Sequence, residues 1–212
     1  MAAGPEPPRV APQGLDVDDV PDNNPPPIRG ASAGATPLAV ALIGLPGSGK
    51  STVARALVAE LGLRRVCRDE VRAAMFPQCD YSFIEKRAAY RGVLLAVEIN
   101  SLLGLSSVID GMTFSRREDY ARLRELARQH RFAVMALRLD CAPALARRRV
   151  AEDALRRAHP ARDRSPELVD AVAARFEEPP ADAVRIDASL PAADVCRRAV
   201  EAVRLRLRGA PA

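Results

Sequence analysis

The chain is 212 residues long and 48% hydrophobic, which suffices for one globular domain with a core of its own. This composition excludes collagen-like, mucin-like and wholly disordered chains. The net charge of +5 is too mild to indicate nucleic-acid binding by itself. Because we find neither an apolar run of about 18 residues nor a secretory signal, we expect a cytoplasmic protein without a membrane partner.

The spacing of the cysteines and histidines does not match that of a structural metal site. The four cysteines, at positions 67, 79, 141 and 196, fit neither a zinc ribbon nor a Cys-x-x-Cys pair. The two histidines, at 130 and 159, lie at no metal-ligand spacing from a cysteine or from each other. We therefore expect free thiols in a reducing compartment.

Residues 1–36 differ in composition from the rest of the chain. They contain eight of the eighteen prolines, no aromatic residue, and five acidic against two basic side chains. Such a segment has too few apolar groups to offset the entropy lost on ordering. We expect a disordered acidic leader that is either dispensable or acts as a docking or autoinhibitory arm, followed by a single domain over 37–208.

Beyond the leader, strand and helix patterns alternate. The apolar run Leu38–Ile43 is typical of a strand buried on both faces. Further strands are predicted at 64–67, 106–109, 132–139 and 183–186. Helices are predicted at 49–61, 69–75 with Asp69 as N-cap, 81–103, 115–130, 142–151, 166–176 and 192–207. This alternation predicts an α/β fold in which a five-stranded parallel sheet carries helices on both faces.

The strongest motif lies between the first strand and the first helix. The stretch GLPGSGKS at 44–51 matches the phosphate-binding loop pattern GxxxxGK[ST] in the context that it requires. Its glycines allow backbone N–H groups to face phosphate oxygens at a helix N-terminus. Lys50 is expected to reach the β- and γ-phosphates, and Ser51 to ligate Mg²⁺. The predicted ATP-binding residues are Gly44, Leu45, Pro46, Gly47, Ser48, Gly49, Lys50, Ser51 and Thr52.

Two carboxylates follow neighbouring strands of the predicted sheet. Asp110 comes after an apolar strand and faces the ligand crevice, so we expect it to support Mg²⁺ through water, although a turn cap would also explain it. Asp69 follows the second strand and is expected to take a proton from a hydroxyl acceptor, or merely to cap its helix. Arg72, one turn later, is expected to steady the acceptor or the transferred group, or to lie on the surface.

Arginines cluster between the last two predicted helices before the fifth strand. Seven lie within residues 142–164, against three acidic residues. Arginines there are typical of a lid that closes over phosphates, although a solvated helix face is the plain alternative. Aromatic residues gather at 76, 81, 83 and 90, and they line either an acceptor pocket or the core.

Taken together, residues 38–205 resemble the AAA-33-type P-loop kinases, which are related to polynucleotide 5′-kinase domains, zeta toxins and antibiotic phosphotransferases. The resemblance rests on GLPGSGKST, CRDEVR, VIDGMTFSRRED, LDCAPALARRRV and ARFEEPP. It implies a P-loop NTPase fold with an Arg-rich lid, and Mg²⁺-ATP as phosphate donor. It also implies Asp69 as general base, Arg72 as a contact to acceptor or phosphate, and Arg148 or Arg149 as the lid arginine. A recurring pattern falls on Asp110, Thr113, Arg116 and Arg117, with DGMT in place of the usual DAT or DTN.

The leading functional hypothesis is an ATP-dependent kinase that phosphorylates a hydroxyl group of a small molecule. A polynucleotide 5′-kinase is the first alternative, and it requires a continuous basic groove leading to Asp69. The second alternative is a nucleotide-binding regulatory module without catalysis. The acceptor, the oligomeric state and the choice between adenine and guanine stay open at this point.

Overall fold

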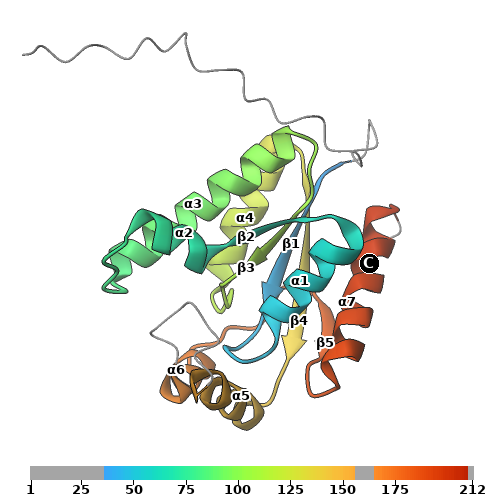
Figure 1. Cartoon of the computed structure of the whole chain (residues 1–212). Helices are drawn as coiled ribbons and strands as arrows, with labels where there is room; N and C mark the ends of the chain where they lie inside the picture. Colours follow the sequence, from blue (N-terminus) through green and yellow to red (C-terminus); the bar gives the residue numbers. More distant parts are fainter. Residues whose placement is uncertain (1–35, 156–164, 210–212) are drawn as a thin grey trace, which may run out of the picture. The chain divides into compact units, whose positions relative to one another are not determined.

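A computed structural model describes residues 36–155 and 165–209. These residues form an α/β domain with the following elements (Figure 1): β1 Leu38–Ile43, α1 Lys50–Leu61, β2 Arg64–Cys67, α2 Arg68–Met75, α3 Phe83–Leu102, β3 Ser107–Asp110, α4 Arg117–His130, β4 Ala133–Asp140, α5 Pro143–Leu155, α6 Pro166–Ala173, β5 Val184–Asp187 and α7 Ala192–Leu207. The predicted leader and the arginines at 156, 157, 162 and 164 lie outside the described residues.

The sheet is parallel throughout and has the order β2-β3-β1-β4-β5. β1 lies at its centre, paired with β3 through Ala39–Ser107 and with β4 through Ala39–Val134. Because β1 is buried along its whole length, its sequence is apolar at every position. The predicted five-stranded parallel sheet is confirmed.

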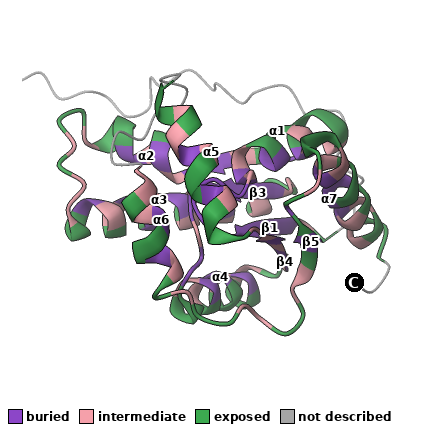
Figure 2. Cartoon of the chain, turned by 90° about the horizontal axis from the view of Figure 1, so that it is seen from below, coloured by how far each residue is buried: buried purple, intermediate pink, exposed green. Residues whose placement is uncertain are grey.

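Side chains of β1 alternate between two cores. Leu38, Val40 and Leu42 pack with α1 and α7, whereas Ala39, Ala41 and Ile43 pack with α3 and α4. Figure 2 shows buried residues concentrated on the strands and on the helix surfaces that face them. Within the described residues both faces of the sheet are therefore covered, so a ligand can reach the sheet at the strand ends.

Helices α5 and α6 pack on each other beyond the carboxyl end of β1. Their apolar side chains, including Ala146, Val150 and Val169, enclose Leu45 of the loop that follows β1. This small third core places the predicted lid helices directly beside the phosphate-binding loop (Figure 1).

The start of α2 corrects one expectation. The helix begins at Arg68, and its N-cap is Cys67, which makes no side-chain capping bond. Asp69 lies in the first turn and is buried. It is therefore not the N-cap, and its carboxylate bonds elsewhere.

In the described part of the chain, no helix is both long and apolar enough to cross a lipid bilayer.

Candidate active site

The loop between β1 and α1 has the geometry of a phosphate cradle. Ser48 N–H donates to the Leu45 carbonyl at 3.1 Å, which curls the loop, and α1 begins at Lys50. Gly47 has φ +82°, and a Cβ there would lie 2.4 Å from the carbonyl oxygen of Ala146 on α5. A glycine is required at this position because the loop touches the lid backbone. The Lys50 ammonium donates to the carbonyls of Gly44 at 2.9 Å and Leu45 at 2.7 Å.

A cavity of about 480 Å³ opens over this loop, a volume typical of small-molecule sites. Its wall has four parts, formed by the phosphate loop, the ends of β2 and β3, the lid helices, and the start of α7. The loop contributes residues 46–53. The strand-end side includes Arg68, Asp69, Asp110, Gly111, Met112 and Thr113, the lid side Arg149, Glu152, Asp153, Leu168, Val172 and Arg175, and the α7 side Ala188, Leu190, Ala192, Val195 and Cys196.

Asp110 is the last residue of β3 and is buried beside Ser51. The Ser51 hydroxyl donates to Asp110 Oδ1 at 3.0 Å, and both side chains line the cavity. A hydroxyl and a carboxylate oxygen are ligands of the type that Mg²⁺ prefers, so the two residues fit the predicted metal site. The turn-cap interpretation also has support, because Asp110 Oδ1 accepts from the Gly111 N–H at 2.8 Å.

Arg65 on β2 is a site residue that the sequence did not single out. Its Nε donates to Asp110 Oδ2 at 2.9 Å, its Nη2 lies 2.8 Å from the same oxygen, and its Nη1 donates to Glu70 Oε1 at 2.6 Å. Burial lowers the pKa of Arg65, but hydrogen bonds to Glu70 and Asp110 outweigh this and raise it above the ordinary arginine value. Arg65 therefore stays cationic and fixes the Asp110 carboxylate from behind.

Asp69 and Arg72 form a buried ion pair on α2. Arg72 Nη2 donates to Asp69 Oδ1 at 3.0 Å, and the Arg72 side chain is 3% exposed. The ring of Tyr81 lies 4.4 Å from the Arg72 guanidinium, in cation–π geometry. Tyr81 holds this position with φ +61°, a conformation unfavourable for a bulky residue. Arg72 does not line the cavity, whereas Asp69 does, so the structure places Arg72 behind Asp69.

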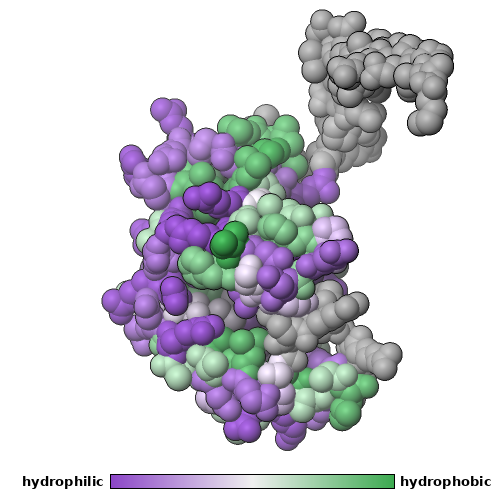
Figure 3. Space-filling view, turned by 90° about the vertical axis from the view of Figure 1, so that its left-hand side faces the viewer, coloured by the Kyte–Doolittle hydropathy of each residue, from purple (hydrophilic) through white to green (hydrophobic). Residues whose placement is uncertain are grey.

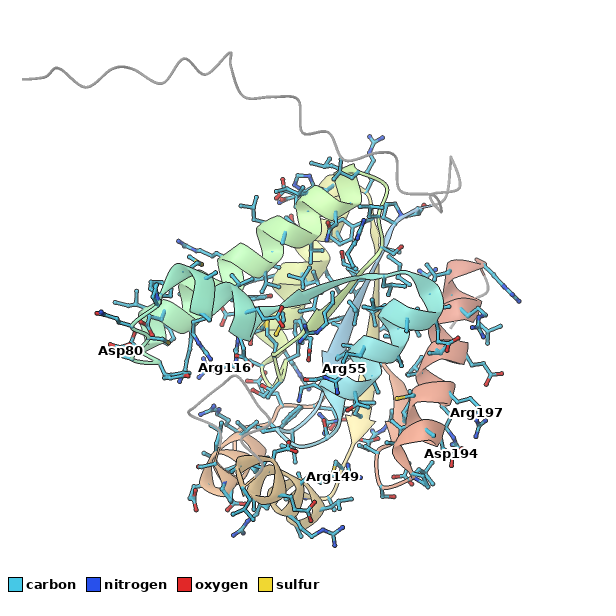
Figure 4. All side chains as sticks on the ribbon, in the orientation of Figure 1. Arg55, Asp80, Arg116, Arg149, Asp194 and Arg197 are labelled. Carbon is cyan, nitrogen blue, oxygen red and sulfur yellow. The ribbon has the colours of Figure 1, made fainter. Side chains whose placement is uncertain are left out.

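The two lid arginines left open by the sequence are placed differently. Arg149 lines the cavity and lies on α5 opposite α1, which carries Arg55 (Figure 4). Arg148 is 70% exposed, pairs with Glu152 at 3.7 Å, and does not line the cavity. Of these two, Arg149 is therefore the one that we propose for contact with a bound phosphate.

The sequence matches a family model described as an AAA domain, AAA_33, over residues 40–179. The chain belongs to the AAA_33 family. The match covers the phosphate loop, Asp69, Asp110 and the lid helices, and it confirms the family that the motifs predicted. A comparison with curated proteins gives no match.

Solved structures share the fold of this AAA_33 chain. A protein from Chloroflexus aurantiacus is 21% identical with a TM-score of 0.68, covering 82% of this chain and 98% of its own. A gluconokinase from Sinorhizobium meliloti 1021 is 17% identical with a TM-score of 0.61, covering 82% and 96%. The APS kinase of Mycobacterium tuberculosis, in complex with AMPPNP and APS, is also 17% identical at 0.61, covering 81% and 98%.

Within the AAA_33 site, four basic residues line the cavity that sequence reasoning had not assigned to it: Arg55, Arg68, Lys86 and Arg175. Lys86 carried a usable signal, because it and Lys50 are the only lysines of the chain and both line the same cavity. Thr113 also lines the cavity, and its carbonyl accepts from the Gly44 N–H at 3.1 Å. Arg117 instead bonds to Glu177 and Glu178, away from the cavity lining.

The aromatic cluster at 76–90 divides between several environments. Tyr90 is in the core and its hydroxyl donates to the Asp119 carbonyl. Tyr81 stacks on Arg72, and Phe83 is exposed. None of these rings lines the cavity over the phosphate-binding loop.

Proposed function

We propose that this chain is an ATP-dependent kinase that transfers the γ-phosphoryl group to a hydroxyl of a small molecule. One observation carries the proposal: the buried carboxylate of Asp69 lines the same cavity as the phosphate-binding loop. A site for nucleotide binding alone requires the loop but not a carboxylate held on the far side of the transferred group.

The α7 side of the cavity suits the nucleoside of the donor. Five small or apolar side chains lie there: Ala188, Leu190, Ala192, Val195 and Cys196. A flat base buries well against such a surface. The base end and the acceptor end are thus on opposite sides of the phosphate loop, which suits transfer between two ligands.

Lys50, Ser51 and Asp110 are the residues that would hold the triphosphate and its magnesium. When bound, Mg²⁺-ATP supplies the transferable phosphoryl group and neutralises part of its charge. Lys50 is then expected to turn from the Gly44 and Leu45 carbonyls toward phosphate oxygens. Arg149 adds positive charge from the lid.

Asp69 is the proposed general base. Its Oδ1 accepts from Arg72, and its Oδ2 has no hydrogen bond within the described residues, so that Oδ2 is available to a ligand. The acceptor oxygen forms a bond to the γ-phosphorus as the bond to the bridging oxygen of ADP breaks. The proton of the acceptor hydroxyl passes to Asp69 Oδ2.

The gluconokinase and APS kinase among the structural neighbours support a small-molecule acceptor by analogy of fold alone. The polynucleotide alternative requires a basic groove that continues to Asp69. Phosphoryl transfer to small molecules and to polynucleotides therefore has to be measured directly.

The test is incubation of the full chain with Mg²⁺ and γ-labelled ATP, together with separate pools of sugars and sugar acids, nucleosides, and 5′-hydroxyl oligonucleotides. We expect label on a small molecule. The rate of labelling should fall at least about 10²-fold in Lys50→Ala, because this lysine stabilises charge that develops on transfer. Label on oligonucleotides alone would establish the polynucleotide kinase instead. Tight ATP binding without any labelled product would establish the regulatory module.

A further inference from the structure

An exposed hydrophobic stripe runs along α3, away from the cavity. Ile84 is 76% exposed, Leu95 56% and Leu102 67%. At 100° per residue these three side chains point within about 20° of each other on the helix. The stripe is about 27 Å long, since it spans 18 residues at 1.5 Å each.

The stripe has further apolar neighbours on one side. Ile99 is exposed on the same face of α3, and Ala88 is half-buried there. Between α2 and α3 the surface forms a groove lined by Met75, Phe83, Ile84, Arg87, Ala88, Arg91, Gly92 and Leu95. Figure 3 shows hydrophobic surface interspersed with hydrophilic surface on this side of the molecule. A row of large apolar side chains exposed along one helix face indicates an interaction site.

Charged side chains lie along one edge of the stripe. Arg87 and Arg91 are exposed, and no carboxylate of the described residues pairs with either. Glu98 is on the same edge, within about 40° of both arginines around the helix. Its carboxylate lies 3.4 Å from His130 and is partly exposed. The edge is therefore basic in its first half and acidic in its second.

We propose that α3 is the interface of a homodimer in which the helices of two copies pack antiparallel about a two-fold axis near position 93. In this arrangement an edge of one helix meets the same edge of its mate, because the interface is isologous. Arg87 and Arg91 then flank the partner's Glu98, so basic and acidic halves meet. A parallel pairing would instead put this edge of one helix against the opposite edge of the other, so the arginines would not reach the partner's Glu98.

The same register matches the apolar side chains. Ile84 meets the partner's Leu102. The small side chain of Ala88 meets the partner's Ile99, which is larger. The two copies of Leu95 lie beside the axis. Large-to-small pairing and central leucines are what close helix packing requires. A second copy therefore satisfies the charges and the shape of this surface with a single register.

Sedimentation equilibrium of the full chain tests the proposal. We expect a species of twice the 22.8 kDa chain mass. Leu95→Asp places two like charges beside the axis, and it should raise the dimer dissociation constant at least about 100-fold. Leu205→Asp changes a similarly exposed leucine on α7 and should leave the constant unchanged. A wild-type chain that stays monomeric at about 100 µM, or a dimer indifferent to Leu95→Asp, would overturn the interface.

A charge swap tests the antiparallel register separately from folding. Arg91→Glu and Glu98→Arg should each weaken the dimer about tenfold, because each loses attraction twice across the two-fold axis. The double variant carries both changes and should recover most of the wild-type affinity. Far-ultraviolet circular dichroism shows whether every variant keeps its helix content. Failure of the double variant to recover while it remains folded contradicts the proposed register.

Discussion

Asp110 is held at both oxygens of its carboxylate. Ser51 donates to Oδ1 from the cavity side, and Arg65 donates to Oδ2 from β2. Because Asp110 is buried, the Arg65 contact also compensates its charge in a region of low polarity. Arg65 is thus a positioning residue: it fixes the carboxylate that faces the proposed metal site.

Replacing Arg65 should therefore cost stability as well as activity. Arg65→Met keeps the length of the side chain but leaves Asp110 Oδ2 without its partner. We expect a loss of about 3 kcal/mol in the free energy of unfolding, since a buried charge becomes uncompensated. Urea denaturation measures this loss. An unchanged urea concentration at the unfolding midpoint would mean that water replaces the guanidinium without a loss in the free energy of unfolding.

Arg148 and Arg149 form a matched pair of neighbours for mutation. Arg149→Ala removes a cation from the cavity wall and should slow phosphoryl transfer by about 10²-fold or more. Arg148→Ala removes an exposed side chain paired only weakly with Glu152, and its rate should stay within about twofold. Steady-state kinetics of both variants compares them directly. Equal losses would show that the lid closes in a different register.

At the level of elements, the phosphate loop depends on its contact with α5. Gly47→Ala forces a Cβ against the Ala146 carbonyl at a positive φ. We expect at least about a tenfold weaker affinity for ATP and a lower melting temperature, because either the loop or α5 has to move. Calorimetric titration and thermal denaturation provide the two measurements.

Gly62→Ala is the control for backbone strain. Gly62 ends α1 at φ +70° with open space around its Cα, so alanine costs about 1 kcal/mol without steric clash. Its affinity for ATP should equal that of the wild type. If the two variants bind ATP alike, the loop does not depend on close packing against the lid.

Most elements were predictable from the sequence because local signals agree with tertiary packing. The apolar run of β1 and the GxxxxGK[ST] pattern at 44–51 determine the strand, the loop and the start of α1 to within one residue. The start of α2 was misplaced because Asp69 is a favourable N-cap residue, whereas its carboxylate in fact binds Arg72. A buried ion pair within the first turns of α2 here overrides the preference of aspartate for the N-cap.

The site was only partly predictable for a related reason. Asp69 and Asp110 follow strands, and parallel strands bring their carboxyl ends to one edge. Arg65 lies in the short strand β2, and its partner Asp110 is 45 residues away, so no local pattern marks it. The choice between Arg148 and Arg149 depends on one residue of helical register, which the run of three arginines conceals.

For the whole molecule, the sheet order explains where the cavity lies. β1 has β3 on one side and β4 on the other, so the connection that follows β1 runs to β2 on one side of the sheet, and the connection that follows β3 crosses to β4 on the other side. The crevice between them receives Asp69 and Asp110 from one side and the α7 wall from the other. The proposal of a kinase rests on this arrangement, with Asp69 at the acceptor end.

The rate of phosphoryl transfer in Asp69→Asn is the most direct measurement of that proposal. Asparagine keeps an oxygen that accepts from Arg72 but cannot take a proton, so ATP affinity should stay close to wild type. Because it also removes the negative charge beside buried Arg72, we expect a lower free energy of unfolding in a chain that still folds. We predict at least about a 10²-fold loss in kcat with the acceptor identified by labelling. Transfer at the wild-type rate by a folded Asp69→Asn chain would contradict the assignment of Asp69 as the base and remove the acceptor-side argument for a kinase.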